Sequence, residues 1–148
     1  MSLPQTTQFQ VPSSLDTLAN VLSWFDQLYQ SFIPKSAWIR CQLALAEGFT
    51  NAVRHAHKGR SSDLYIDLEV TILERQLEIR IWDFGEPFDL VKKIKDILAK
   101  TKDKPTDINS LSCGGGGRGL LLMYDIADYL SYEQGEDGRN CLLIIKQF

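Results

Sequence analysis

Two adjacent stretches of the sequence alternate between apolar and polar residues almost without interruption. In residues 63–74, DLYIDLEVTILE, aliphatic side chains fall on every second position, and residues 76–84, QLEIRIWDF, repeat the pattern. Successive side chains of a strand point to opposite faces of a sheet, so the alternation predicts two strands with one dry and one wet face. The break around Glu74, Arg75 and Gln76 is short, and we therefore expect an antiparallel hairpin.

Apolar residues recur at helical spacing in three further stretches of the chain. Residues 15–32 predict a helix that ends before Pro34. Residues from about Lys35 to His57 predict a second helix, and residues 119–130, GLLLMYDIADYL, predict a third. These helices need an apolar surface to cover, and the dry face of the hairpin supplies one.

Short strands are expected near both ends of the sequence. Residues 6–12, TTQFQVP, alternate until Pro12, while YLSYEQ at 129–134 and NCLLIIKQF at 140–148 predict a closing hairpin. Residues from about 89 to 109 are rich in lysine and weakly patterned, with room for a short helix at LVKKIKDILAK. The order is strand, two helices, two strands, a loop segment, a helix and two strands, which predicts an α+β sandwich.

Length and composition bound the class of protein. The chain has 148 residues, 44% of them apolar and 24% charged, and we expect one globular domain over residues 1–148. The formal net charge is −3 without a basic run, so direct binding to nucleic acid is not expected. No apolar run approaches the roughly 20 residues of a membrane helix, and MSLPQTTQF is no export signal, so we expect no membrane partner and a cytoplasmic location. We interpret Cys41, Cys113 and Cys141, which are far apart, as reduced thiols.

The predicted second helix carries a carboxylate and an amide one turn apart. Glu47 and Asn51 stack at the edge of its apolar stripe, and the small residues Ala44, Gly48 and Ala52 leave room for close approach. Glu and Asn at this spacing suit a divalent cation and the polarisation of a hydroxyl group, because Mg²⁺ binds a few hard oxygens and keeps several waters. An ordinary amphipathic helix accounts for the same residues, and this alternative stays open.

Asp83 falls on the apolar face of its predicted strand. Counting by two from Leu77 along the apolar positions reaches Asp83. An ionised carboxylate that points toward a core is costly unless hydrogen-bond donors meet it. The exocyclic amine of adenine is such a donor, and Gly85, two residues later, lets a flat ring pass close to the backbone. The alternative is a strand that ends in a polar turn, with Asp83 outside the core.

Residues 113–122, CGGGGRGLLL, hold five of the ten glycines directly before a predicted helix. Free backbone N–H groups and the positive end of a helix dipole form an anion site at such a position, and glycine lets the backbone wrap a polyphosphate. Arg118 adds a positive charge. The run matches neither G-x-x-x-x-G-K-[ST] nor G-x-G-x-x-G after a strand, the two common nucleotide fingerprints. A flexible hinge is the alternative.

Together the three motifs predict one ATP site, and in order and spacing they resemble a known superfamily. EGFTNAVRHA at 47–56, DFGEPFD at 83–89 and GGGGRGLLLM at 114–123 look like the ATP-site motifs of the GHKL ATPases, which include histidine-kinase catalytic domains. Within that superfamily the sequence most resembles the bacterial anti-sigma factors that are also serine protein kinases. The resemblance implies a two-layer α/β sandwich of the histidine-kinase-like ATPase (Bergerat) type, a mixed sheet with helices on one face, and a mobile ATP lid at about 89–117.

The resemblance also implies roles for residues of the three motifs. Glu47 matches the acidic residue that activates the attacking hydroxyl, and Asn51 matches the Mg²⁺ ligand. Asp83 matches the adenine-binding aspartate, with Gly85 beside it. The third motif matches the loop that contacts the phosphates, with charge added by its arginine; its residues are Gly115, Gly117, Arg118 and Gly119.

One departure from the family pattern lies in the final hairpin. The family usually carries Gly-Thr before the last strand, whereas this chain has Gly138, Arg139 and Asn140. The contact made by that threonine is therefore either lost or replaced.

The predicted function is that of an ATP-dependent serine protein kinase and anti-sigma regulatory factor. The resemblance implies that it phosphorylates a small anti-sigma-factor antagonist and sequesters a sigma factor, and it makes a homodimer plausible. Two alternatives remain open: a non-catalytic binding module in which ATP orders the lid and so switches partner affinity, and a detached catalytic domain of a histidine kinase. Glu47 favours catalysis over the first. The second has less support, because the sequence has no helical hairpin with a phosphoacceptor histidine.

Overall fold

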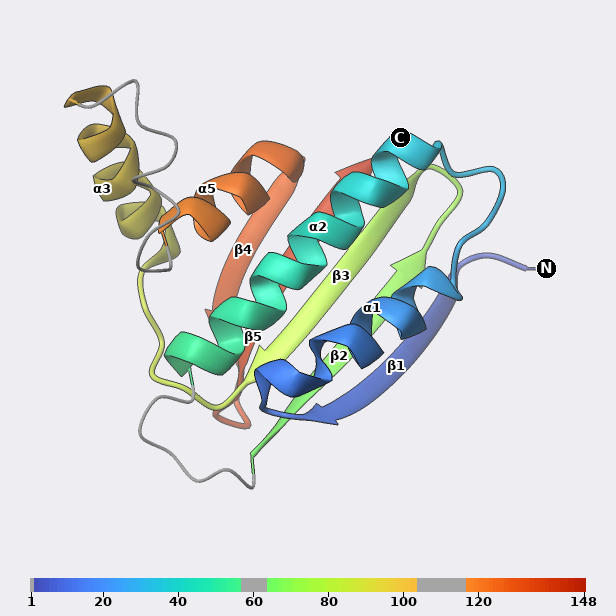
Figure 1. Cartoon of the computed structure of the whole chain (residues 1–148), viewed down its shortest axis with the longest axis horizontal. Coiled ribbons are helices and arrows are strands. Elements are labelled where there is room, and N and C mark those ends of the chain that lie inside the picture. The colour runs from blue at the N-terminus through green and yellow to red at the C-terminus, as the bar shows by residue number, and fades with distance from the viewer. Residues whose placement is uncertain (1, 57–63, 104–116) are drawn as a thin grey trace.

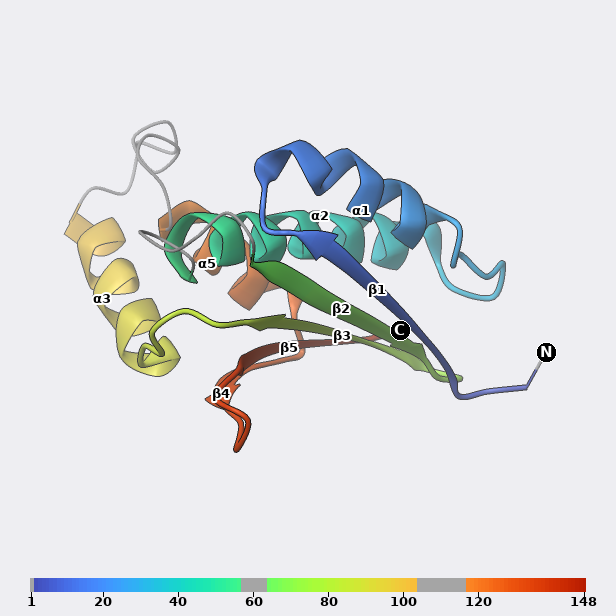
Figure 2. The ribbon, with the colours of Figure 1, turned by 90° about the horizontal axis from the view of Figure 1, so that it is seen from below.

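The described residues form one five-stranded sheet that is covered on a single face by helices. The structure is a computed structural model, and it describes residues 2–56, 64–103 and 117–148. The strands are β1 (Gln5–Pro12), β2 (Tyr65–Ile72), β3 (Gln76–Asp83), β4 (Tyr129–Gln134) and β5 (Asn140–Gln147). Their order across the sheet is β1-β2-β3-β5-β4, and Figures 1 and 2 show the helices above one side of it. The two-layer α+β sandwich is confirmed.

The sheet is antiparallel at every strand pairing in the described residues. The mixed sheet that the resemblance implied is therefore wrong. The reason is the position of β5, which returns from β4 through a hairpin and inserts between β3 and β4. β3 and β4 run in the same direction but do not pair, because β5 separates them.

The predicted hairpins form with the expected partners. β2 and β3 pair with Val70 opposite Ile79, and the Leu73 N–H donates to the Gln76 carbonyl at 2.9 Å to close the turn. Between β4 and β5 the chain turns at Gly138, which has a φ of 83°. Glycine adopts this left-handed conformation without the steric cost of a Cβ atom.

Two helices connect β1 to β2 over the sheet. A 3₁₀ turn, η1 (Leu15–Thr17), leads into α1 (Leu18–Asp26), and α2 (Lys35–Asn51) continues into a π-helical turn, η2 (Ala52–Ala56). The Ser14 side chain caps the first turn by accepting the Asp16 N–H at 3.2 Å. The predicted end of the second helix at His57 lies outside the described residues.

The first helix ends earlier than the apolar spacing predicted. α1 stops at Asp26, and residues 27–34 form turns in which the Ile33 N–H donates to the Gln30 carbonyl at 2.9 Å. The Tyr29 hydroxyl donates to the Ile33 carbonyl at 3.0 Å, so its ring packs on the core from a turn. Apolar periodicity does not distinguish a helix from successive turns that bring side chains to the same core.

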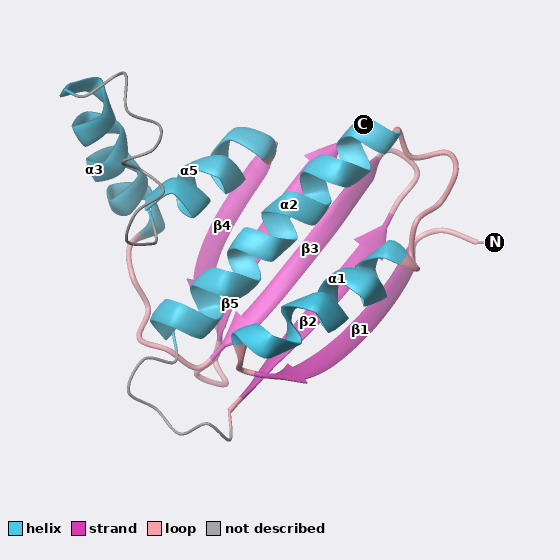
Figure 3. Ribbon diagram, viewed as in Figure 1, coloured by secondary structure: helices cyan, strands magenta, loops and turns pink. Residues whose placement is uncertain are grey.

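Two further helices follow β3. α3 (Leu90–Asp103) occupies the first part of the predicted lid, and α5 (Gly117–Ile126) packs along α2, as Figure 3 shows. Residues 104–116 lie outside the described residues. No helix in the described parts of the chain is both long enough and apolar enough to cross a bilayer.

The core lies between the sheet and α2, with α1 and α5 on either side. Every second residue of β2 and β3 is buried. So is an apolar stripe that runs along α2 into η2 and consists of Ala37, Cys41, Ala44, Leu45, Gly48 and Ala52. Phe25 of α1 stacks on Trp38 of α2 with ring centroids 4.1 Å apart. The other face of the sheet is polar, with Gln8 donating to Glu69 at 2.9 Å. The dry and wet faces predicted for the central hairpin are confirmed.

Candidate nucleotide site

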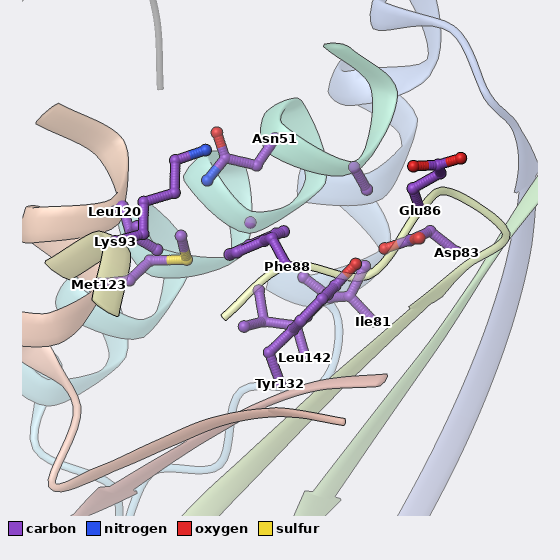
Figure 4. A pocket seen from close by; sticks show the side chains of 12 residues that line it. Asn51, Ile81, Asp83, Glu86, Phe88, Lys93, Leu120, Met123, Tyr132 and Leu142 are labelled. Atoms are coloured by element: carbon purple, nitrogen blue, oxygen red, sulfur yellow. The ribbon is translucent and has the colours of Figure 1, made fainter. Parts of the chain in front are cut away.

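A small cavity lies where the sheet, α2, α5 and the start of α3 meet. It encloses about 60 Å³, and Figure 4 shows the side chains that line it. Its walls are largely apolar, with Ile81 from β3, Leu142 from β5 and Met123 from α5. The charged and polar side chains of the lining are Asn51, Asp83, Glu86, Lys93 and Tyr132.

Asp83 is the buried carboxylate of this cavity. It is the last residue of β3 and is only 3% exposed, so the alternation of the strand predicted its face correctly. Its Oδ1 accepts one hydrogen bond from the backbone N–H of Gly85 and one from the side-chain amide of Asn140, both at 2.9 Å. Its second oxygen, Oδ2, receives neither of these bonds.

Asn140 holds Asp83 and Gly85 together from the neighbouring strand. It is fully buried at the start of β5, directly opposite Asp83 in the pairing of β3 with β5. Its Nδ2 donates to Asp83 Oδ1 and, at 2.6 Å, to the carbonyl oxygen of Gly85. A buried side-chain amide at the start of β5 thus links the end of β3 to the backbone that follows it. The Asn140 Oδ1 is buried and has no hydrogen-bond partner among the described residues.

α2 brings Glu47 and Asn51 to the same end of the molecule as Asp83. Asn51 lines the cavity, whereas Glu47 lies one turn earlier and packs against Gly119 of α5. Between them Gly48 forms part of the cavity wall, and a Cβ atom there would lie 2.7 Å from Ile81 Cδ1. The absence of a side chain at Gly48 therefore lets α2 approach β3 closely.

The glycine-rich motif leads into the first turn of α5. The helix begins at Gly117, so Gly117, Arg118 and Gly119 form the turn whose backbone N–H groups have no partner within the helix. Gly115 lies outside the described residues, as does the side chain of Arg118. Gly119 is buried because it faces Glu47. An anion near this turn would meet the positive end of the helix dipole.

Phe88, Lys93 and Tyr132 are among the lining residues that the sequence did not identify as site residues. Phe88 and Lys93 lie in the segment before and within α3, where no periodic pattern identified them. The Lys93 ammonium lies 4.8 Å from the centre of the Phe88 ring, and Phe88 stacks on Tyr132 with ring centroids 4.4 Å apart. The inward direction of Tyr132 could have been predicted, because Tyr132 lies two residues after Leu130 and therefore on the same face of β4.

The Tyr132 hydroxyl is a buried polar group of the lining that lacks a hydrogen-bond partner among the described residues. In Figure 4 it points toward the Asp83 carboxylate. Burial, then the negative charge of Asp83 and a hydrogen-bonding contribution from the same carboxylate, raises the pKa of the phenol well above its usual value. The hydroxyl oxygen is nevertheless buried without a partner of hydrogen-bond geometry among the described residues.

Comparison with known families matches almost the whole chain to one of them. The model of the histidine kinase-like ATPase domain covers residues 11–146. That span includes both strands of the central hairpin, α2, and the glycine-rich motif with α5.

Curated relatives of the chain are bacterial serine-protein kinases. The serine-protein kinase RsbW of Listeria monocytogenes is 36% identical over 96 residues, which cover 64% of this chain and 58% of that protein. RsbW of Bacillus pumilus is 34% identical over 88 residues, which cover 59% of this chain and 52% of that protein. The matched region thus spans little more than half the length of these relatives.

A solved structure shares the fold. The crystal structure of the RsbU and RsbW domains of a Mycobacterium tuberculosis protein superposes with a TM-score of 0.63 and 12% identity, over 97% of this chain and 32% of that one. At this identity the likeness concerns the fold alone.

Proposed function

The chain belongs to the family of histidine kinase-like ATPase domains, and on this premise we propose that it is an ATP-dependent serine protein kinase. One arrangement carries the proposal. Asp83 and Asn51 line the same cavity, and Glu47 lies one helical turn from Asn51 beside the start of α5. The carboxylate that would bind the base and the amide that would bind the metal thus line one cavity, and the carboxylate that would act as acid–base catalyst lies one helical turn away.

The cavity suits a purine that carries an exocyclic amine. Ile81 and Leu142 offer apolar surface to a flat ring, and Asp83 Oδ2 is an acceptor for the amine. One buried polar atom of the cavity lining, the Tyr132 hydroxyl, has no described partner, which is typical of a site that a polar ligand completes. These features support adenine as the base.

The lid would have to move for a nucleotide to enter. The cavity of about 60 Å³ is well below the roughly 300–1,000 Å³ of ligand pockets. α3, Phe88 and Lys93 close one side of it. We therefore propose that residues 89–117 act as an ATP lid that opens and closes over the cavity.

Asn51 is the residue that would hold Mg²⁺. Its amide oxygen is a hard ligand on the cavity wall, and Mg²⁺ needs only one or two such protein groups beside phosphate oxygens and water. The ion would neutralise the charge of the triphosphate when bound. The backbone of Gly117 and Gly119 at the start of α5, together with Gly115 and Arg118, would bind the phosphates.

Glu47 would act as the general base. Its carboxylate would take the proton from the hydroxyl of a substrate serine while the serine oxygen attacks the γ-phosphorus of ATP. The new bond joins the serine oxygen to phosphorus, the bond from the γ-phosphorus to the bridging oxygen breaks, and ADP leaves. This chemistry depends mainly on positioning. The orientation of the Glu47 carboxylate therefore matters as well as its negative charge.

The substrate and partner that we propose come from the likeness to the RsbW kinases. The serine would belong to a small antagonist of anti-sigma factors, and the sequestered partner would be a sigma factor in the cytoplasm. The nucleotide state of the cavity would then decide which of the two proteins is bound.

The direct test is phosphate transfer from labelled ATP to candidate antagonist proteins. Glu47→Gln should keep ATP binding but slow transfer by about 10²–10⁴-fold, the usual share of a general base. Glu74→Gln, at an exposed carboxylate in the turn between β2 and β3, is the matched control and should transfer at the normal rate. Binding of ATP and partner with no transfer by either the unmodified chain or Glu47→Gln would identify a non-catalytic, ATP-gated binder instead.

A further inference from the structure

Tyr132 places an unused hydroxyl beside the base-binding carboxylate. It lies in β4, opposite Leu142 of β5, and both side chains line the cavity. Figure 4 shows the hydroxyl directed at Asp83. The hydroxyl oxygen is buried and no described residue satisfies it. A buried, unpaired hydroxyl of this kind costs free energy unless a ligand or water pairs with it.

The hydrogen-bond character of the two groups is complementary. An ionised carboxylate only accepts hydrogen bonds, and Oδ1 of Asp83 is already occupied by Gly85 and Asn140. Burial raises the pKa of the Tyr132 phenol, so it remains a protonated donor throughout the physiological range. The cavity therefore presents an acceptor, Asp83 Oδ2, next to a donor, the Tyr132 hydroxyl.

We propose that Tyr132 is a second base-reading residue of the site, whose hydroxyl donates a hydrogen bond to a ring nitrogen that flanks the amine bound by Asp83. This inference rests on the proposed ATP site. In adenine the exocyclic amine is a donor, and the ring nitrogens on either side of it, N1 and N7, are acceptors. The adenine amine thus matches the acceptor Asp83 Oδ2, and a neighbouring ring nitrogen matches the donor Tyr132 hydroxyl. Guanine presents an acceptor, O6, where adenine has the amine, and would face the Asp83 carboxylate unfavourably.

Phe88 covers the Tyr132 ring. Its ring stacks on Tyr132 at a centroid distance of 4.4 Å and an interplanar angle of 23°. Ile81, Leu142 and Met123 belong to the packed core, whereas Phe88 lies in the connection between β3 and α3. A base that reaches Tyr132 therefore displaces Phe88 rather than the core residues.

Calorimetric titration with ATP and two analogues tests the contact. 1-Deaza-ATP and 7-deaza-ATP each replace one flanking ring nitrogen by carbon. Tyr132→Phe removes only the hydroxyl and keeps the stack on Phe88, so ATP should bind about tenfold more weakly, the equivalent of one hydrogen bond. The unmodified chain should lose a similar factor with one of the two analogues. With that analogue, Tyr132→Phe should cause no further loss, and this identifies the nitrogen as N1 or N7.

Tyr129→Phe is the control, because Tyr129 lies in the same strand but is 52% exposed. It should bind ATP and both analogues as the unmodified chain does. The inference would be overturned if Tyr132→Phe bound ATP as tightly as the unmodified chain does, or if it lost affinity for ATP and for both analogues by the same factor. Either result would leave the ATP site intact. If Tyr132→Phe does not fold, equal affinity of the unmodified chain for ATP and both analogues still overturns it. Failure of the unmodified chain to bind ATP at all would instead remove the proposed function and this inference together.

Discussion

Asn140 donates its side-chain amide to Asp83 Oδ1 at 2.9 Å, across the pairing of β3 with β5. The same nitrogen donates to the Gly85 carbonyl at 2.6 Å. One buried amide thus fixes both the orientation of the carboxylate and the path of the backbone that follows it. Asn140 of the final hairpin thus supports the base-binding end of the site from behind Asp83.

Replacement of Asn140 should weaken the fold and the site together. Asn140→Ala leaves the buried Gly85 carbonyl and one bond of Asp83 unpaired, which should lower the free energy of unfolding by about 1–3 kcal/mol. Asn140→Thr offers one hydroxyl donor in place of two amide protons. Its free energy of unfolding should therefore lie between those of Asn140→Ala and the unmodified chain. Urea unfolding measures the first effect and ATP titration the second. Equal stability of all three proteins would show that the two hydrogen bonds contribute nothing.

Gly48 should not tolerate a methyl group. A Cβ atom there would lie 2.7 Å from Ile81 Cδ1 and 3.2 Å from Leu142 Cδ2, so Gly48→Ala should destabilise the protein by about 1–3 kcal/mol despite the better helix propensity of alanine. Ile81→Val removes the Cδ1 atom that is hit. In that background Gly48→Ala should cost clearly less, as a double-mutant cycle of unfolding free energies would measure. If the losses of unfolding free energy caused by Gly48→Ala and Ile81→Val were strictly additive, the close approach of α2 to β3 would be contradicted.

The sequence allowed prediction of the site where side-chain alternation and helical spacing act locally. Asp83 could be assigned to the buried face because strand period is a local property, and Glu47 and Asn51 could be paired because residues four apart lie on one face of a helix. The burial of Asp83 and the stripe of α2 follow these expectations. The helix predicted before the glycine-rich motif also exists, as α3.

Features set by distant parts of the chain could not be predicted in the same way. The pairing of Asn140 with Asp83 depends on β5 inserting next to β3, and the antiparallel sheet follows from that same insertion. Phe88 reaches Tyr132 only through the folded path of the connection after β3. α1 ends at Asp26, and the apolar residues that follow reach the core from turns rather than from a longer helix. These turns depend on packing against the rest of the fold.

The effect of Gly119→Ala on stability should change sign when the Glu47 side chain is removed. A Cβ atom at Gly119 would overlap the Glu47 carboxylate, so Gly119→Ala should displace that carboxylate and be neutral or destabilising. In a Glu47→Ala background the clash is absent, and the higher helix propensity of alanine should stabilise the protein by about 1 kcal/mol. Thermal unfolding of the four proteins measures this coupling. The same small effect of Gly119→Ala in both backgrounds would show that Glu47 does not rest against α5.

Stability should fall at alkaline pH because of Cys41 in the core. Burial raises the pKa of the Cys41 thiol from 9.0 to about 12. Below pH 9 both folded and unfolded chains keep the proton, so this thiol adds no pH dependence. Above pH 9 the unfolded chain loses the proton and the folded one retains it, and the free energy of unfolding should decrease by about 1.4 kcal/mol per pH unit from this group. Urea unfolding between roughly pH 8 and pH 10.5 should therefore give a shallower slope for Cys41→Ala than for the unmodified chain. Parallel slopes would mean that the thiol ionises as readily in the folded protein as in the unfolded chain, contrary to its burial on the inner face of α2.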